Sequence, residues 1–254
     1  LGSGGRVRQH RARRLGHAGR LSRAGGSVKI PGRETSTFLQ TCRFTALRGL
    51  FAIAGNGRAL DEAARHYGDN TAWQLGRVTL NPLVHIDPVG TVLMPLVLYS
   101  ATSGAFLFGY AKPVPVHFGN LRDPKRHMVL VALAGPASNF VQAIFWALLL
   151  VLLTGLGVWE PFFLKMAQGG MLVNLVMWAF NLFPLPPLDG GRILVGLLPW
   201  KQAQMVSRIE PWGFFIVMGL VLAGVVTTLW LRPLMALGYG ALRVLLTPLL
   251  ALLR

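Results

Sequence analysis

Residues 174–192 read NLVMWAFNLFPLPPLDGGR, an apolar run that ends in a proline cluster and then in one carboxylate. The prolines predict the end of a helix, because proline lacks the N–H that continues the helical ladder. The two glycines after the carboxylate allow a close turn of the backbone. A carboxylate at the end of an apolar span is costly without a partner, which makes Asp189 a candidate functional residue. The other interpretation of these residues is that Asp189 only caps the next helix.

Long apolar stretches dominate the rest of the chain. The 254 residues are 53% hydrophobic and 13% charged, whereas soluble domains carry about 25% charged residues. A helix needs about 20 apolar residues to cross a bilayer, and four stretches qualify, at residues 89–110, 128–154, 166–187 and 212–231. A fifth, 233–253, carries Arg243 and either spans the bilayer or lies along it. We therefore expect an all-α polytopic membrane protein with about four to six transmembrane helices.

Charge is distributed unevenly between the expected loops. Loops 111–127 and 189–211 are rich in lysine and arginine, whereas residues 155–161 contain only Glu160 as a charged residue. By the positive-inside rule the two basic loops face the cytoplasm and 155–161 faces outward. We expect a multi-pass protein of the bacterial inner membrane, with the lipid bilayer as a partner.

Cys42 is the only cysteine, which excludes a disulfide framework and a cysteine zinc site.

The first 43 residues differ in composition from the remainder. Residues 1–66 hold 13 of the 25 lysines and arginines, and residues 1–43 lack apolar periodicity. We expect 1–43 to be a disordered, low-complexity segment and 44–254 to be the membrane domain, with a small β-containing segment at 73–86. A basic arm can bind nucleic acid, but we expect no such partner. A shifted reading frame or a wrong start explains the composition better, and our hypothesis is that residues 1–60 are such an artefact.

Residues 181–191 (NLFPLPPLDGG) resemble the Asn-x-x-Pro-x-Pro-x-x-Asp-Gly signature of the site-2 proteases, a family of intramembrane zinc metalloproteases. Segments 63–88, 110–118 and 134–139 (AGPASN) are also similar, so the resemblance covers about residues 61–230. It implies that Asp189 is a zinc ligand and that Asn181 holds the substrate strand or polarises its carbonyl. It also implies that the substrates are transmembrane proteins, cleaved in or near the membrane.

The first signature of that family, His-Glu-x-x-His, is absent. Two histidines at i and i+4 would bind zinc, and the glutamate would act as general base. The family spacing, counted back from Gly68 and Asp69, places this motif at residues 56–60, which read NGRAL. Asparagine, glycine and leucine cannot replace two imidazoles and a carboxylate. We therefore expect this chain neither to bind zinc, the cofactor of the family, nor to cleave peptides.

Other residues and other functions remain as alternatives. Glu62 and His66 are spaced i and i+4 and could complete a zinc site with Asp189, although they also fit an ordinary helix beyond the motif. His85, His117 and His127 have no ligand-like spacing, and we expect interfacial or hydrogen-bonding roles for them. A membrane scaffold that binds transmembrane partners without cleaving them is one alternative function. A transporter is another, which the lack of an inverted repeat disfavours.

The reading-frame hypothesis makes a direct prediction. One of the other two frames of the coding DNA upstream of Ala63 should encode His-Glu-x-x-His within an apolar span. Sequencing the genomic locus checks this. If no frame contains the motif, the chain is a true pseudoprotease and the artefact hypothesis is wrong.

Overall fold

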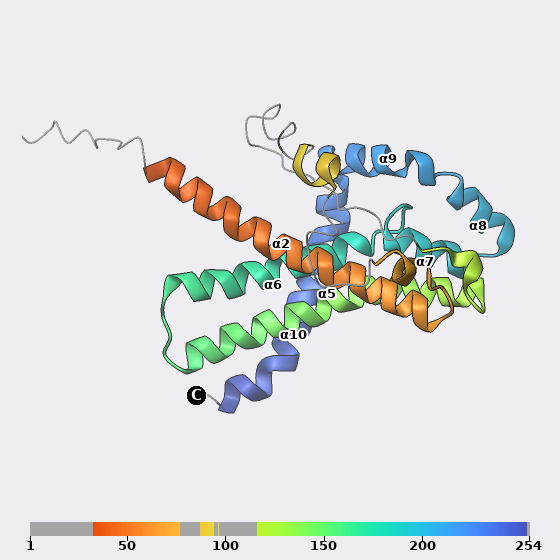
Figure 1. The fold of residues 1–254 in the computed structure, drawn as a ribbon. Helices are drawn as coiled ribbons and strands as arrows, with labels where there is room; N and C mark the ends of the chain where they lie inside the picture. Colours follow the sequence, from red (N-terminus) through yellow and green to blue (C-terminus); the bar gives the residue numbers. More distant parts are fainter. Residues whose placement is uncertain (1–32, 77–86, 94–95, 97–115, 253–254) are drawn as a thin grey trace, which may run out of the picture. The chain divides into compact units, whose positions relative to one another are not determined.

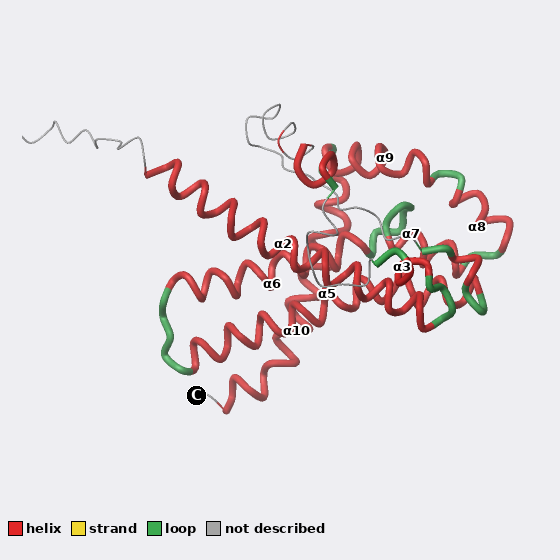
Figure 2. The backbone as a smooth tube through the Cα atoms, in the orientation of Figure 1, coloured by secondary structure: helices red, strands yellow, loops and turns green. Residues whose placement is uncertain are grey.

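The computed structural model describes residues 33–76, 87–93, 96 and 116–252. The chain divides into two units, Leu1–Cys42 and Arg43–Arg254. Helices make up the described elements, and no strand occurs among these residues (Figures 1 and 2). In chain order the elements are α2 (Arg33–His66), α3 (Thr71–Gln74), η2 (Pro88–Leu93), η3 (Phe118–Asn120), α5 (Pro124–Gly155), α6 (Pro161–Asn181), α7 (Asp189–Leu197), α8 (Trp200–Ser207), α9 (Glu210–Leu222), η4 (Val226–Leu231) and α10 (Arg232–Leu252).

Helix α2 crosses a boundary that the sequence predicted. It begins at Arg33, before the boundary expected at residue 43. It ends at His66 because Gly68, with φ +117°, takes the left-handed conformation that closes a helix. The N–H of Asp69 bonds to the carbonyl of Ala64 at 2.9 Å, which completes the closing turn. Whether residues 1–43 form a separate disordered segment stays a prediction.

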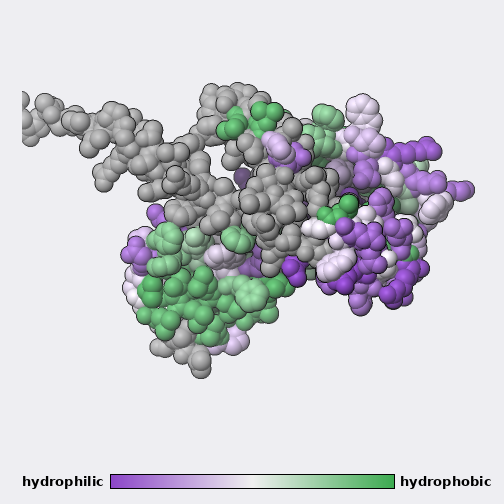
Figure 3. Space-filling view, in the orientation of Figure 1, coloured by the Kyte–Doolittle hydropathy of each residue, from purple (hydrophilic) through white to green (hydrophobic). Residues whose placement is uncertain are grey.

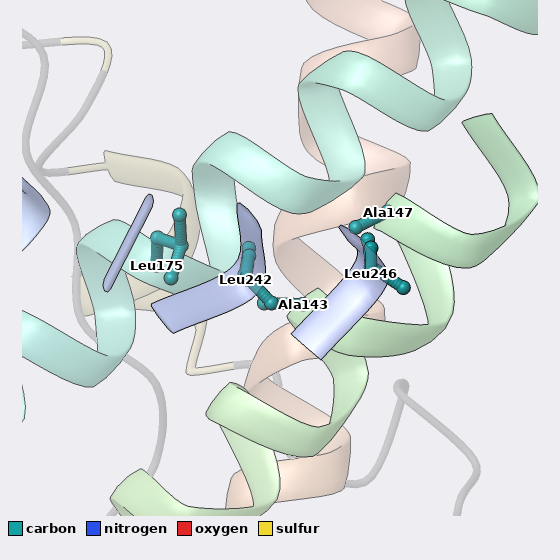
Figure 4. Packing of buried hydrophobic residues seen from close by; sticks show 5 residues of the cluster. All are labelled: Ala143, Ala147, Leu175, Leu242 and Leu246. Atoms are coloured by element: carbon teal, nitrogen blue, oxygen red, sulfur yellow. The ribbon is translucent and has the colours of Figure 1, made fainter. Parts of the chain in front are cut away.

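Small residues bring three helices together in the core of the second unit. Ala143 and Ala147 of α5 pack with Leu175 of α6 and with Leu242 and Leu246 of α10 (Figure 4). Glycines allow the same close approach elsewhere on these helices: a Cβ added at Gly170 or Gly238 would collide with a tryptophan side chain. Small residues at helix contacts are typical of membrane helices, where backbones approach closely to gain van der Waals contact.

Several helices can cross a membrane by length and composition. Among the described residues these are Pro124–Gly155, Pro161–Asn181 and Val226–Ala251, and α8 with α9 would count as a fourth if the bent pair were one span. At most 28% of the apolar window of each of the three is buried inside the protein. Figure 3 shows apolar residues gathered over α5, α6 and α10, and hydrophilic residues at the end where α7 and α8 lie. An apolar surface of this extent indicates contact with lipid.

The expected β-containing segment is not seen in the part of the chain that the structure describes. Trp73 and Gln74, its first two residues, belong to α3. Residues 77–86, which include the β-like stretch 77–80, lie outside the described residues. The all-α class is confirmed.

Two expected spans and one expected loop differ from the structure. The stretch 212–231 is interrupted, because Gly224 has φ +73° and separates α9 from η4. The second half of that stretch continues into α10, so that 226–251 is one candidate span and includes most of the fifth stretch, 233–253. Most of 89–110 lies outside the described residues, apart from η2. The loop expected at 189–211 is mainly two short helices, α7 and α8.

The predicted topology can be tested by cysteine labelling of the full chain with Cys42→Ser. Asn120 and Gln202 are exposed, so single cysteines there are reachable by a reagent. Both should be shielded from an impermeant maleimide in intact cells and labelled after the cells are opened, because the basic segments face the cytoplasm. Glu160→Cys should react in intact cells. External labelling at residue 120 or 202 would overturn the assignment.

Candidate functional site

Asp189 lies where the chain turns from α6 into α7. Helix α6 ends at Asn181, and the N–H of Phe183 bonds to the carbonyl of Phe180 at 3.0 Å in a tighter turn. A short loop with a cis Pro186–Pro187 bond follows. Leu188 is the N-cap of α7 and Asp189 its first helical residue. Asp189 is therefore not the N-cap, although its charge is favourable at a helix N-terminus.

Glycines press against the backbone of this loop from two directions. A Cβ at Gly190 would collide with the carbonyl of Leu182, and one at Gly191 would collide with the backbone at Pro186. From α9, Gly213 approaches the carbonyl of Pro186 just as closely. The loop that carries Asp189 is thus held by close backbone contacts that no larger residue permits.

Trp230 of η4 completes the end of α6. Its indole N–H donates to the carbonyl of Ala179 at 2.8 Å, and its ring meets Phe183 edge to face at a centroid distance of 5.6 Å. In a continuing α-helix the N–H of Phe183 would bond to Ala179, but here it bonds to Phe180. The carbonyl of Ala179 thus loses its helical donor where α6 ends, and the indole N–H of Trp230 replaces that donor.

The carboxylate of Asp189 is buried against α2 and α5. The residue is 6% exposed. A Cβ at Gly135 would lie 2.9 Å from Oδ2 of Asp189 and even closer to Oδ1 of Asn56. Both oxygens therefore lie over the same point of the α5 backbone, close to each other. Oδ1 of Asn56 is buried and has no hydrogen-bond partner among the described residues. An amide from α2, a carboxylate from α7 and the bare backbone of α5 thus meet at one point.

Burial controls the ionisation of Asp189. It raises the pKa of Asp189, which lies outside the candidate spans, to about 7, and the Arg192 guanidinium lowers it only partly. Arg192 is also engaged with Glu210 at 3.9 Å, and its guanidinium lies 5.4 Å from the centre of the Phe118 ring. A second cation near the carboxylate would favour its charged form.

Asn181, the predicted substrate-positioning residue, is the last residue of α6. It is 8% exposed, and its Nδ2 has no hydrogen-bond partner in the described structure. A buried amide donor without a partner is rare in a native fold and calls for an explanation such as a ligand or a water. Both polar side-chain atoms of Asn139 and the Nε2 of Gln142 are also buried without a hydrogen-bond partner among the described residues.

A second polar cluster holds the end of α2 at the start of α5. The buried carboxylate of Asp69 accepts hydrogen bonds from the N–H of His117 at 2.7 Å, from Nδ2 of Asn120 at 3.2 Å and from both the N–H and hydroxyl of Thr71. Burial raises the pKa of Asp69, but these hydrogen bonds more than offset it and leave the pKa below its usual value. Asp69 therefore fixes the direction in which α2 leaves the site.

The alternative zinc ligands are not brought to Asp189. Glu62 and His66 are exposed, whereas Asp189 is buried; Glu62 pairs with Arg65 at 4.0 Å and His66 packs on Tyr67. His127 stacks on Tyr67 and its Nδ1 accepts the N–H of Asp123 at 3.0 Å, as expected of a hydrogen-bonding residue. His117 is exposed and His85 lies outside the described residues.

The residues at this point do not fit a zinc ion. Catalytic zinc takes three protein ligands, preferably imidazole nitrogens with a carboxylate. The side chains offered are an amide oxygen from Asn56 and the carboxylate of Asp189, while Gly57 offers none. Leu60, one turn after Asn56, is buried among apolar residues that include Val131. No group of three His, Cys, Asp or Glu side chains suited to a metal occurs in the described part of the chain.

Curated proteins with similar sequences are named as zinc metalloproteases. "Putative zinc metalloprotease YwhC" of Bacillus subtilis is 38% identical over 162 residues, which cover 60% of this chain and 68% of that protein. "Putative zinc metalloprotease Rip2" of Mycolicibacterium smegmatis is 33% identical over 165 residues, which cover 63% of this chain and 59% of that protein. No family model matches the chain. No solved structure matches it either.

The described elements are helical, several of these helices are able to cross a membrane, and a carboxylate is buried just beyond the end of α6. Together with the sequence similarity to proteins named as zinc metalloproteases, these features define the class of the protein. The chain belongs to the site-2 protease family.

The sequence predicted roles for Asp189 and Asn181, and these roles stay predictions. It did not point to the residues that surround them. Asn56 counted only as a missing histidine, and nothing predicted that its side chain lies beside Asp189. Gly213 and Trp230 lie far from the motif in the chain, and nothing in the sequence links them to it. Neither residue stands out in its stretch, which also contains Trp212, Phe214, Phe215, Gly219 and Gly224.

The contact between Gly213 of α9 and the loop at Pro186 predicts that an added methyl group lowers stability at Gly213 and not elsewhere in the helix. Gly213→Ala should lower the free energy of unfolding by about 1–3 kcal/mol, because the new Cβ meets the backbone of Pro186 and cannot be relieved by a rotamer change. Gly219→Ala in the same helix has open space around it and should be neutral or stabilising by about 0.5–1 kcal/mol. Thermal unfolding in detergent measures both, and equal effects would contradict this packing.

Proposed function

We propose that a polypeptide with this sequence does not hydrolyse peptides, whether residues 1–60 are genuine or come from a shifted reading frame. It is a site-2 protease homologue that keeps the means to hold a transmembrane segment and lacks the means to cleave it. The position of Asn56 carries this proposal. Its side chain lies beside Asp189, and family spacing assigns the first zinc-binding histidine to the same residue. The register counted along the sequence and the contact in the structure therefore agree.

Two chemical deficits follow from residues 56–60. One carboxylate with an amide oxygen is a weak site for Zn²⁺, which prefers nitrogen and sulfur donors. Gly57 stands where the general base is expected, and proton transfer by a positioned base contributes roughly 10²–10⁴-fold to a rate. Loss of the metal and loss of the base act on the same step, so we expect no measurable hydrolysis.

Retained amides support a binding role. A transmembrane segment that unwinds exposes peptide N–H and C=O groups, which are costly in lipid unless the protein pairs them. Nδ2 of Asn181, next to the loop that carries Asp189, is a donor without a partner among the described residues. Asn139 on α5 has such a donor and such an acceptor but is fully buried, so a partner segment would reach it only where the helices separate. A membrane scaffold that holds unwound transmembrane partners is the function that uses these groups. It would be a multi-pass protein of the inner membrane with its basic segments in the cytoplasm.

Metal analysis and a cleavage assay test the absence of hydrolysis. The purified full chain should contain far less than one zinc per protein and should not cleave a transmembrane substrate above the level of Asp189→Ala. Stoichiometric zinc that disappears in Asp189→Ala would defeat the proposal and indicate other ligands.

A repair variant is the matched positive control. The triple variant Asn56→His, Gly57→Glu, Leu60→His restores the family motif on a helix whose residue 56 already faces Asp189. It should bind one zinc, and Asp189→Ala in that background should abolish the binding. A folded repair variant without zinc would mean that α2 does not present residues 56 and 60 to Asp189.

A further inference from the structure

Helix α8 has a distinct exposed face. Of its eight residues only Ala203 is buried. Lys201, Met205 and the C-cap Arg208 follow at i, i+4 and i+7, so they share the side of the helix away from Ala203. All three are exposed, and Trp200 at the start of the helix is 70% exposed. Two cations with a flexible apolar side chain between them, beside a tryptophan, is a composition suited to the boundary between lipid and water.

The direction of α8 also suits that boundary. Helix α9 is apolar on all sides, with Trp212, Phe215 and Leu222 exposed, as expected of a helix in hydrocarbon. The axes of α8 and α9 differ by 66°. When α9 enters the bilayer, this bend turns α8 toward the plane of the membrane surface.

Other exposed cations lie near α8. Gly196 of α7 packs on Val129 and on the carbonyl of Lys125, which brings the base of α8 to the first turn of α5. The cations at these two places are exposed, and we call them the basic rim: Arg122, Lys125, Arg126, Lys201 and Arg208. Figure 3 shows hydrophilic residues at this end of the molecule.

Acidic residues near the rim are fewer than its cations. Glu210 pairs with Arg192, which is not part of the rim, and Asp123 keeps its charge while it accepts the N–H of Arg126 as the N-cap of α5. Five cations against one carboxylate give the rim an excess of positive charge.

We propose that α8 lies in the headgroup layer of the cytoplasmic leaflet and binds anionic phospholipid through Lys201 and Arg208, with Met205 inserted between them. Basic side chains near an anionic leaflet each favour the bound state about fivefold. The inference is independent of whether the chain cleaves peptides.

Interfacial anchoring of α8 sets the depth of the candidate site. Asp189 is the first residue of α7, and α8 follows this helix of nine residues after Leu198 and Pro199. At 1.5 Å per residue α7 spans about 13 Å, and the extended connection to Trp200 adds at most about 10 Å. Asp189 therefore lies within roughly 25 Å of the start of the anchored helix. Anchoring would keep the carboxylate at a constant level below the headgroups.

Site-directed labels in vesicles test the location of α8. In the full chain with Cys42→Ser, a spin label or an environment-sensitive fluorophore is placed at Met205→Cys. The protein is reconstituted in phosphatidylcholine with or without phosphatidylglycerol. The spin label should report the depth of the headgroups, measured by its accessibility to oxygen and to a nickel complex. The emission of the fluorophore should shift to the blue when phosphatidylglycerol is present. Labels at Phe215→Cys and Asn120→Cys serve as references for the hydrocarbon and for water.

Charge variants separate lipid binding from simple exposure. Lys201→Gln with Arg208→Gln should abolish the shift caused by phosphatidylglycerol. Arg232→Gln with Arg243→Gln, which also removes two exposed cations, should leave it unchanged. A label at residue 205 at the depth of Phe215 would make α8 and α9 a broken span, and a label in water would leave α8 unbound. Either outcome overturns the proposal, as does a shift that survives loss of Lys201 and Arg208.

Discussion

The hydrogen bond from Trp230 to the carbonyl of Ala179 meets the constraint on which the site depends. Inside a membrane protein a helix can stop only where other groups satisfy the backbone that it leaves unpaired. Helix α6 stops at Asn181, close to apolar surface, and the carbonyl that loses its helical partner is taken over by an indole from a distant segment. The stop allows the chain to turn and places Asp189 at the start of α7 rather than on the side of a long span.

Close packing by small residues supports that turn. Within lipid there is little hydrophobic gain in bringing two helices together, so contact area decides which helices associate. Alanines on α5 let α6 and α10 approach, and Gly213 lets α9 approach the loop backbone. The same absence of side chains at Gly135 leaves room for Asn56 and Asp189 to meet. One rule of packing thus explains both the core and the shape of the site.

The turn of α2 that faces the buried carboxylate carries asparagine, glycine and leucine at residues 56, 57 and 60. None of these side chains is an imidazole or a carboxylate. A buried carboxylate is costly in its charged form, and burial accordingly raises the pKa of Asp189 to about 7. Nδ2 of Asn181 and both polar side-chain atoms of Asn139 have no hydrogen-bond partner among the described residues.

Much of this protein could be read from its sequence, because the decisive signals are local. Apolar length predicted α5 and α6, and the proline cluster predicted the end of α6. The Asp-Gly-Gly motif indicated Asp189 as a candidate functional carboxylate, and its role stays a prediction. Those signals depend only on backbone chemistry and on hydropathy over neighbouring residues. The break at Gly224, the long reach of α2 and the helices between 189 and 211 were not predicted, since each depends on packing rather than on local composition. Which residues surround Asp189 was decided by tertiary structure alone: Asn56, Gly135, Gly213 and Trp230 come from four different elements, and only the approach of their helices brings them to one loop.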